Sequence, residues 1–395
     1  MIYIDYNATT PVDPRVNQAA QIWNAEKFGN ASSGDHAWGW ESFEAVEDSR
    51  RALADFVNSA PREITLTSGA TESVNLALKG FAFAKDLGKK DIVTSTAEHE
   101  AVLGACRQIE RLTSVRAKYL PVDRVGRIDL TALANIIEPG HATLVALIHA
   151  NNENGTINPI REAAKIAHDA GALFFTDATQ ALGKIPVDVR ADGVDMAAFS
   201  AHKIYGPKGV GALFIRGGEP NIELEPLIVG GGQERGLRSG TLNVPGIVGF
   251  GEACRIAQME MAEEAERVRR LRDRLESALL AQLPNLRING DLNNRLPNTS
   301  NITFSGVDAR TLIRHMNFVA VSTRSACSSG SPGPSHVLKA TGLSDDEAYA
   351  SIRFSLGRFN TKEEIDRATA LVVSSVRKLR SLRITTAPRN PAFPS

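Results

Sequence analysis

The sequence has few cysteines and no excess of charge of either sign. Its three cysteines are irregularly spaced along 395 residues, which excludes the disulfide framework of small secreted domains. Acidic and basic residues balance at 45 each, so no broad basic surface is available for non-specific binding of nucleic acid. We therefore expect a protein of a reducing compartment that does not bind nucleic acid directly.

Long hydrophobic runs are also absent. No apolar stretch approaches the roughly 20 residues of a membrane-spanning helix. The first residues, Met1 to Asp5, lack the basic and apolar regions of a signal peptide. These absences predict a cytoplasmic protein that does not associate with a membrane. The length predicts two or three domains, since domains commonly hold roughly 100–200 residues.

Short apolar strands and helical segments alternate through the first part of the chain. This alternation predicts an α/β fold with a mostly parallel sheet that carries helices on both faces. The later part, which follows a helical pattern at about 247–283, predicts a small α+β domain. We place the large domain at 15–255, the small domain at 1–14 and 256–385, and a disordered tail that contains several prolines at 386–395. The strands expected in the large domain lie at 63–68, 91–95, 143–148, 172–175 and 212–215, with a further apolar run that ends at Ser200.

One lysine lies between two of these strand-like runs. Lys203 follows the run that ends at Ser200 and precedes a turn that contains Gly206 and Pro207. Such a turn lets backbone approach a ligand closely. Burial lowers the pKa of an amine, and an amine in such a place is suited to form a Schiff base with a carbonyl cofactor. The alternative is a surface lysine beside a turn.

Other polar residues follow the remaining strands, where ligands bind in parallel sheets. The small residues Gly69 to Thr71 stand between a strand and a helix, an arrangement that aims backbone N–H groups at a phosphate. Pyridoxal phosphate (PLP) also needs a carboxylate for its ring nitrogen and a group over its ring, and its amino-acid substrates need an arginine. Asp177, His99 and Arg353 are the candidates for these three roles. The alternatives are a helix cap at Asp177, a polar neighbour at His99 and a loop without a ligand at Gly69.

Only one of the three cysteines lies outside a helical, apolar segment. Cys106 and Cys254 lie in such segments and are expected to be packing residues. Cys327 lies in a loop of small residues, near Arg324, whose charge would favour the thiolate. It is either an incidental loop cysteine or a nucleophile.

These residues stand in motifs that resemble the cysteine desulfurases of the NifS/IscS type, within class V of the PLP-dependent aminotransferase fold. The resemblance runs from Asp5 to about Arg380. The motifs that carry it are Ser68-Gly69-Ala70-Thr71-Glu72-Ser73, Glu98-His99, Asn151-Asn152-Glu153, Thr176-Asp177-Ala178-Thr179-Gln180, His202-Lys203-Ile204-Tyr205-Gly206-Pro207-Lys208-Gly209, Arg238-Ser239-Gly240-Thr241, Ser325-Ala326-Cys327 and Ser351-Ile352-Arg353-Phe354-Ser355.

The resemblance implies a fold type I PLP-dependent transferase with a seven-stranded sheet, acting as a homodimer. It implies that L-cysteine is converted to L-alanine and that Cys327 takes the sulfur as a persulfide and passes it to an acceptor protein. No metal is implied. The implied roles are PLP attachment at Lys203, the ring nitrogen at Asp177, the ring face and acid–base chemistry at His99, the ring oxygen at Gln180, the phosphate at Ala70, Thr71, Ser200 and His202, and the other subunit's phosphate at Thr241. Asn152, Arg353 and Asn7 are implied to hold the substrate, and Asn152 is implied to contact the cofactor as well.

The sequence departs from this family in the cysteine loop. Arg324 stands where the NifS/IscS branch usually has glycine, and Pro332-Gly333-Pro334 stands where Leu-Glu-Pro is usual. Both departures bear on the acceptor, so we keep two destinations for the sulfur open. These are iron–sulfur cluster assembly and thio-modification of nucleic acid, including DNA phosphorothioation. The alternative functions are a class V aminotransferase, a selenocysteine lyase, and a sulfur-relay subunit whose PLP fold is only a scaffold.

Overall fold

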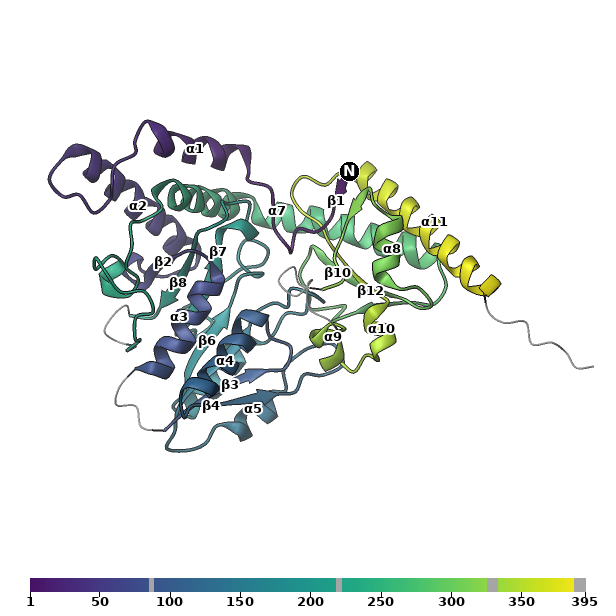
Figure 1. Cartoon of the computed structure of the whole chain (residues 1–395), viewed down its shortest axis with the longest axis horizontal. Helices are drawn as coiled ribbons and strands as arrows, with labels where there is room; N and C mark the ends of the chain where they lie inside the picture. Colours follow the sequence, from purple (N-terminus) through teal and green to yellow (C-terminus); the bar gives the residue numbers. More distant parts are fainter. Residues whose placement is uncertain (85–88, 218–221, 325–332, 387–395) are drawn as a thin grey trace, which may run out of the picture.

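The computed structural model describes residues 1–84, 89–217, 222–324 and 333–386 (Figure 1). The predicted nucleophile Cys327 lies outside these residues, as does most of the predicted tail. The last helix runs to Thr386, one residue into the segment that we predicted as tail.

A seven-stranded sheet forms the centre of the large domain, as predicted. Its strand order is β2-β8-β7-β6-β5-β3-β4. The five neighbouring strands β4, β3, β5, β6 and β7 pair in parallel, whereas β8 is antiparallel to both β7 and β2. The strands are β2 (Ile64–Thr67), β3 (Lys90–Ser95), β4 (Arg116–Leu120), β5 (Ala142–Ile148), β6 (Leu173–Asp177), β7 (Met196–Ser200) and β8 (Gly211–Ile215).

Strand β4 is absent from the sequence-based expectation. It lies at the edge of the sheet, where it pairs only with β3 among the described strands. An edge strand does not need an apolar sequence, and charged side chains on such a strand protect its free edge. Arg116 and Lys118 interrupt the apolar pattern by which the other strands were recognised, so the sequence did not predict this strand.

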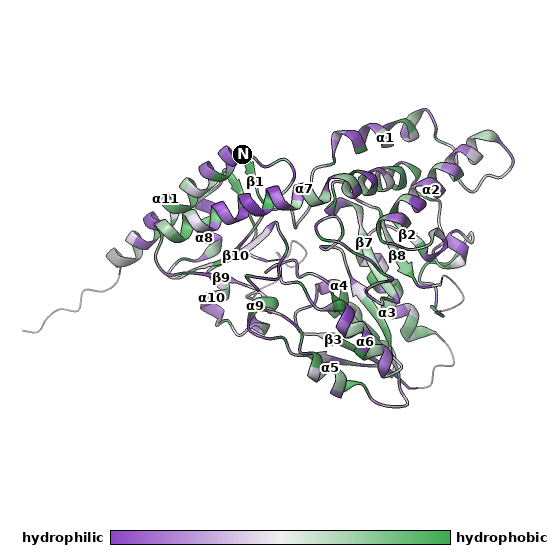
Figure 2. Cartoon of the chain, turned by 180° about the vertical axis from the view of Figure 1, so that it is seen from behind, coloured by the Kyte–Doolittle hydropathy of each residue, from purple (hydrophilic) through white to green (hydrophobic). Residues whose placement is uncertain are grey.

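Successive side chains of the central strands enter two different cores, because neighbouring residues of a strand point to opposite faces. Val145 and Phe174 pack in one core, whereas Leu144 and Phe175 pack in the other. This explains why these strands read as continuous apolar runs, which are mostly hydrophobic in Figure 2. The first face is covered by α1 (Pro14–Ala25), α2 (Ala37–Phe56), α5 (Leu130–Ile136), α6 (Ile160–Asp169) and the start of α7 (Val244–Gln282), and the second by α3 (Ala70–Phe83) and α4 (Glu100–Leu112).

The small domain has a separate core, built on an antiparallel sheet of order β12-β10-β9. The first strand of the chain, β1, pairs with β11 in this domain, so the N-terminal segment lies beside residues more than 300 positions later. The elements of this part are β1 (Ile2–Tyr3), β9 (Leu286–Asn289), β10 (Thr299–Phe304), α8 (Ala309–His315), β11 (Val319–Ala320), α9 (His336–Ala340), α10 (Asp345–Tyr349), β12 (Ser351–Ser355) and α11 (Lys362–Thr386).

The long helix α7 belongs to both domains (Figure 1). Its Phe250 and Ile256 pack in the core of the large domain, whereas Val268 and Leu275 pack in the core of the small domain. The predicted division at residue 255 remains a prediction. No helix in the described part of the chain is long and apolar enough to cross a membrane.

Candidate active site

A cavity of about 370 Å³ opens where the sheet, the start of α3 and the start of α4 meet. It lies at the carboxyl ends of β6 and β7, which is where ligands bind in sheets of this kind. Eleven of the thirteen residues predicted from the sequence line it: Asn7, Ala70, Thr71, His99, Asn152, Asp177, Gln180, Ser200, His202, Lys203 and Arg353. The two others are Thr241, which is exposed and does not line the cavity, and Cys327, which lies outside the described residues.

Lys203 enters the cavity from a short 3₁₀ turn (η2, Ala201–Lys203) that follows β7. Its Nζ donates to the backbone oxygens of Asn7 at 2.6 Å and of Ala8 at 2.7 Å. Lys203 therefore lies just beyond the carboxyl end of the apolar strand β7, and the N-terminal segment of the chain holds its amine there.

Asp177 ends β6 and is buried. Its Oδ1 accepts a hydrogen bond from the backbone N–H of Thr179 at 3.0 Å. This contact is a local turn and not the helix cap that the sequence left as an alternative, because no helix lies in the fully described segment between β6 and β7. It occupies only one carboxylate oxygen. The other oxygen, Oδ2, is the atom that would meet a ligand in the cavity.

His99 caps the N-terminus of α4. Its Nδ1 accepts from the backbone N–H of Ala101 at 3.1 Å. A neutral imidazole that accepts at Nδ1 carries its proton on Nε2. The cap thus sets both the orientation of the ring and its tautomer, while the ring lines the cavity.

A buried acid precedes this histidine. Burial, assisted by the negative charge of Asp177, raises the pKa of Glu98 to about 8. The hydroxyl of Ser95 donates to Glu98 Oε1 at 2.7 Å. Glu98 is therefore protonated at neutral pH. The sequence contained the motif Glu98-His99 but no signal that the glutamate is buried.

The start of α3 and the end of β7 form a cradle at one side of the cavity. Gly69 has a φ of 153°, which favours glycine, and it precedes the free N–H groups of the first helical turn. Gly211 lies so close that a Cβ atom would come within 2.6 Å of Gly69 Cα. Ser200 is buried beside them, and His202 faces the same cavity.

His202 is neutral in this cradle. Burial, followed by the positive charges of Lys203 and two further lysines, lowers its pKa to about 3. Its Nδ1 lies 3.0 Å from Thr9 Oγ1. We assign the proton to Nε2, because the threonine hydroxyl can then donate to Nδ1. His202 Nε2 is in that case a donor suited to a phosphate oxygen.

Glu72 also lines the cavity beside this cradle, where a negative charge would oppose phosphate. Burial disfavours its ionisation, but hydrogen bonds from Arg238 and Ser68 outweigh burial and keep its pKa below the usual value. The Nε of Arg238 donates to Glu72 Oε1 at 2.8 Å. This ion pair neutralises the carboxylate and ties the glycine-rich segment around Arg238 to the start of α3.

Arg353 projects from β12 and is almost completely buried. Its Nη1 donates to the backbone oxygen of Asn152 at 3.0 Å, and its Nη2 donates to Asp5 Oδ1 at 2.7 Å. Its Nε is buried without a hydrogen-bond partner in the described part of the chain. A buried donor of this kind is costly to leave unpaired, which favours an anionic ligand beside it.

The side chain of Asn7 forms three hydrogen bonds within the protein. Its Nδ2 donates to the backbone oxygen of Asn152 at 3.2 Å and to Thr299 Oγ1 at 2.8 Å, and its Oδ1 accepts from Asn298 at 3.0 Å. Both amide protons are thus used within the protein. Asn7 joins the N-terminal segment to the small domain, and its predicted contact with substrate remains a prediction.

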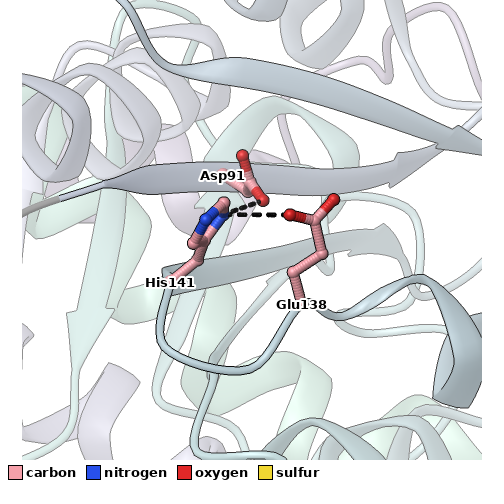
Figure 3. A group of neighbouring side chains, drawn as sticks. All are labelled: Asp91, Glu138 and His141. Carbon is pink, nitrogen blue, oxygen red and sulfur yellow. Dashed lines mark hydrogen bonds and ion pairs between the residues drawn. The ribbon is translucent and has the colours of Figure 1, made fainter.

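A cluster that resembles a metal site, Asp91, Glu138 and His141, lies at the opposite edge of the sheet (Figure 3). Asp91 stands at the start of β3, far along the strand from the cavity edge. Lys118 Nζ lies 2.7 Å from Asp91 and 2.8 Å from Glu138, and Arg116 contacts both carboxylates. Two cations already balance the two carboxylates, so we assign the cluster as an ion-pair network.

The comparisons with known proteins agree with this geometry. Residues 2–368 match the class-V aminotransferase family. The cysteine desulfurase IscS of Anaeromyxobacter sp. (strain Fw109-5) is 50% identical over 381 residues, which cover 96% of this chain and 94% of that protein. The chain belongs to the cysteine desulfurase branch of the class-V aminotransferases. The predicted family, fold and enzyme class are confirmed, and the family is PLP-dependent.

Solved structures of related desulfurase-like proteins share the fold over nearly the whole chain. A NifS-like protein matches with a TM-score of 0.88 and 38% identity, over 95% of this chain and 99% of that chain. SspA in complex with cysteine matches with a TM-score of 0.79 and 36% identity, over 91% and 100%. DndA from Streptomyces lividans matches with a TM-score of 0.76 and 38% identity, over 89% and 98%.

Proposed function

We propose that this cysteine desulfurase binds PLP at Lys203, converts L-cysteine to L-alanine and takes the sulfur onto Cys327. The observation that carries the proposal is that Lys203, Asp177 and Arg353 line one and the same cavity. These three residues supply an amine, a carboxylate and a partly unpaired guanidinium, which are the groups that PLP and an amino-acid substrate need.

The residues present fit PLP. Lys203 would hold its aldehyde carbon, Asp177 Oδ2 its ring nitrogen, and the start of α3 with Ser200 and His202 its phosphate. Gln180 stands beside Lys203, and its Nε2 donates to Asn7 O at 2.9 Å, which leaves its second amide proton for the ring oxygen. When bound, the cofactor supplies a ring that accepts electrons from the substrate carbon.

Three side chains of the protein have separate roles in binding and converting the substrate. The guanidinium of Arg353 binds the substrate carboxylate, with the backbone of Asn152 holding that guanidinium in place. The amine of Lys203 takes the proton from the substrate Cα. His99, with its tautomer set by the cap on α4, covers the ring face and is placed to move a proton at Nε2.

The sulfur step balances without an outside oxidant or reductant. The thiolate of Cys327 attacks the substrate sulfur, an S–S bond forms and the C–S bond breaks. The electron pair of the broken bond goes to the substrate Cβ, which takes a proton and becomes the methyl group. Lys203 returns a proton to Cα, and L-alanine leaves. Cys327 then carries a persulfide, which an acceptor thiolate can attack in turn.

The acceptor is a protein that serves iron–sulfur cluster assembly or thio-modification of nucleic acid, including DNA phosphorothioation. The similarity to an IscS and to DndA supports both destinations. The balanced charge of the chain favours a protein acceptor over direct contact with nucleic acid.

A homodimer is the proposed assembly. Phe28, Trp38, Trp40 and Phe43 are each at least half exposed, and the rings of Phe28 and Trp38 lie 4.9 Å apart. Exposed aromatic clusters of this kind mark protein interfaces. Thr241 is exposed and outside its own cavity, which is compatible with its predicted role at the partner's phosphate. A solution mass of twice 42.5 kDa is expected, and a monomeric mass would contradict it.

The decisive experiment for the activity is to trap the persulfide. The PLP-loaded protein is incubated with L-cysteine, alkylated and digested, and each cysteine peptide is weighed by mass spectrometry. We expect one added sulfur on Cys327 alone, because Cys106 and Cys254 are buried and burial raises the pKa of both thiols. The peptides of these two cysteines are internal controls.

The Cys327→Ala variant separates the alternative functions. A desulfurase loses L-alanine and sulfide production from L-cysteine while it keeps the cofactor's absorption. Unchanged turnover of L-cysteine would contradict the proposal, and turnover of L-selenocysteine alone would indicate a selenocysteine lyase. Amino transfer to a 2-oxo acid would indicate an aminotransferase, and failure to bind PLP would indicate a scaffold.

A further inference from the structure

We infer that Asp5 is a positioning residue that links the substrate-carboxylate site at Arg353 to Ser322, the residue five positions before Cys327. The inference rests on the proposed function, in which Arg353 binds the substrate carboxylate. It adds that binding at Arg353 and the hydrogen bond of Ser322 are energetically coupled through one carboxylate group.

The two oxygens of Asp5 have two different partners. Oδ1 accepts from Arg353 Nη2 at 2.7 Å, and Oδ2 accepts from Ser322 Oγ, also at 2.7 Å. The side chain of Asp5 is 14% exposed and that of Arg353 is 1% exposed, so water screens their ion pair weakly. Asp5 is thus the counter-charge of a buried arginine and, through its other oxygen, the anchor of a serine side chain.

The backbone around Asp5 brings the three residues together. Asp5 forms a parallel bridge with Ser355 at the end of β12, and Ser322 forms an antiparallel bridge with Arg353 itself. Ser322 N donates to Arg353 O at 3.3 Å, and Arg353 N donates to Ser322 O at 2.7 Å. Ser322 is thus held to β12 by its backbone and to Asp5 by its side chain.

A substrate carboxylate at Arg353 changes the electrostatic environment of the Asp5 carboxylate. With a second anion beside the guanidinium, Asp5 shares Arg353 with the ligand and is less fully neutralised. A less neutralised carboxylate accepts the hydroxyl proton of Ser322 more strongly. Binding at Arg353 therefore strengthens the hydrogen bond that holds Ser322. By linkage, this hydrogen bond in turn raises the affinity of the site for the substrate.

Two single variants separate this link from a structural role. In Asp5→Asn the competing charge is removed while the shape is kept, so the affinity for the product L-alanine should rise about fivefold, the lower end of common coupling effects. The rate of persulfide formation at saturating L-cysteine should fall in the same variant. A merely structural role for Asp5 would instead lower affinity and rate together.

In Ser322→Ala the carboxylate keeps its charge and loses only the hydroxyl bond. Persulfide formation at saturating L-cysteine should fall about tenfold, as expected for one hydrogen bond to a charged group. By linkage, the affinity for L-alanine should also fall, by about the fivefold factor through which binding strengthens this bond. The matched control is Ser300→Ala, which removes a buried hydroxyl on β10 that has no hydrogen-bond partner in the described residues. This control should change neither quantity.

The measurements use the PLP-loaded full chain. Affinity for L-alanine is read from the change in cofactor absorption, and persulfide formation from rapid quenching and mass spectrometry. Weaker L-alanine binding in Asp5→Asn, or unmodified persulfide formation in Ser322→Ala, would overturn the inference. Failure of the proposed function looks different, because the unmodified chain would then form no persulfide while the L-alanine measurement still tests Asp5.

Discussion

The Nζ atom of Lys203 lies 2.6 Å from the backbone oxygen of Asn7, which is 196 positions earlier in the chain. The same amine contacts the backbone oxygen of Ala8 at 2.7 Å. The N-terminal segment therefore closes the cavity around the lysine, although it begins in the small domain, where β1 pairs with β11. The candidate active site depends on contacts between the N-terminal segment and a lysine near the middle of the chain.

Removal of this lysine should abolish the chemistry without unfolding the protein. In Lys203→Ala we expect turnover of L-cysteine to fall by about 1,000-fold or more, because the attachment point and the base for the Cα proton are both lost. PLP should then be released on dialysis, as followed by absorption. Lys165→Ala, on the exposed face of α6, is the matched control and should retain cofactor and activity. Tight PLP binding by Lys203→Ala would contradict the assignment.

Glu98 should make the protein less stable as pH rises toward 8. Its pKa is raised from 4.5 to about 8, so between these values the native state holds a proton that the unfolded state has lost. Stability therefore falls with rising pH across this window and levels above it. Glu98→Gln should flatten this slope and raise the melting temperature at pH 8 more than at pH 5, by a few degrees. Calorimetry of both proteins across this range checks it, and parallel curves would contradict it.

His149 should make the protein less stable as pH falls. Burial lowers its pKa from 6.5 to about 4, so the unfolded state gains a proton in this window and the native state does not. Stability is lost as pH falls from 6.5 toward 4. His149→Asn should reduce that loss, measured by thermal unfolding at pH 7 and pH 5. The exposed His315→Asn serves as control, and an equal loss in both variants would refute the effect of burial.

Loss of a cationic side chain from the ion-pair network at Asp91 should lower the stability of the protein, whereas a metal chelator should not. Lys118→Met leaves the buried carboxylate of Asp91 with less compensation, and we expect a loss of about 2 kcal/mol in the free energy of unfolding. The exposed pair in Lys165→Met should cost less than about 1 kcal/mol. EDTA should leave the melting temperature unchanged. A melting temperature that falls with EDTA would show that the cluster binds a metal.

Much of the cavity was predictable because its residues follow strands. Asp177, Ser200 and Lys203 come directly after buried apolar runs, and parallel strands bring their carboxyl ends to one edge. Sequence reasoning missed what depends on partners. It did not predict that Glu98 is buried and protonated, or that Asn7 uses both amide protons on Asn152 and Thr299.

The sequence by itself determined the order of elements, the family motifs and the residue types that chemistry requires. Those are local properties, set by apolar periodicity and by the conformational preferences of glycine and proline. Only the tertiary structure decided how single atoms are shared. Asp5 divides its two oxygens between Arg353 and Ser322, which are more than 300 positions away. Such a division depends on the packing of β12 against the N-terminal segment and leaves no pattern in the sequence around any one of the three residues.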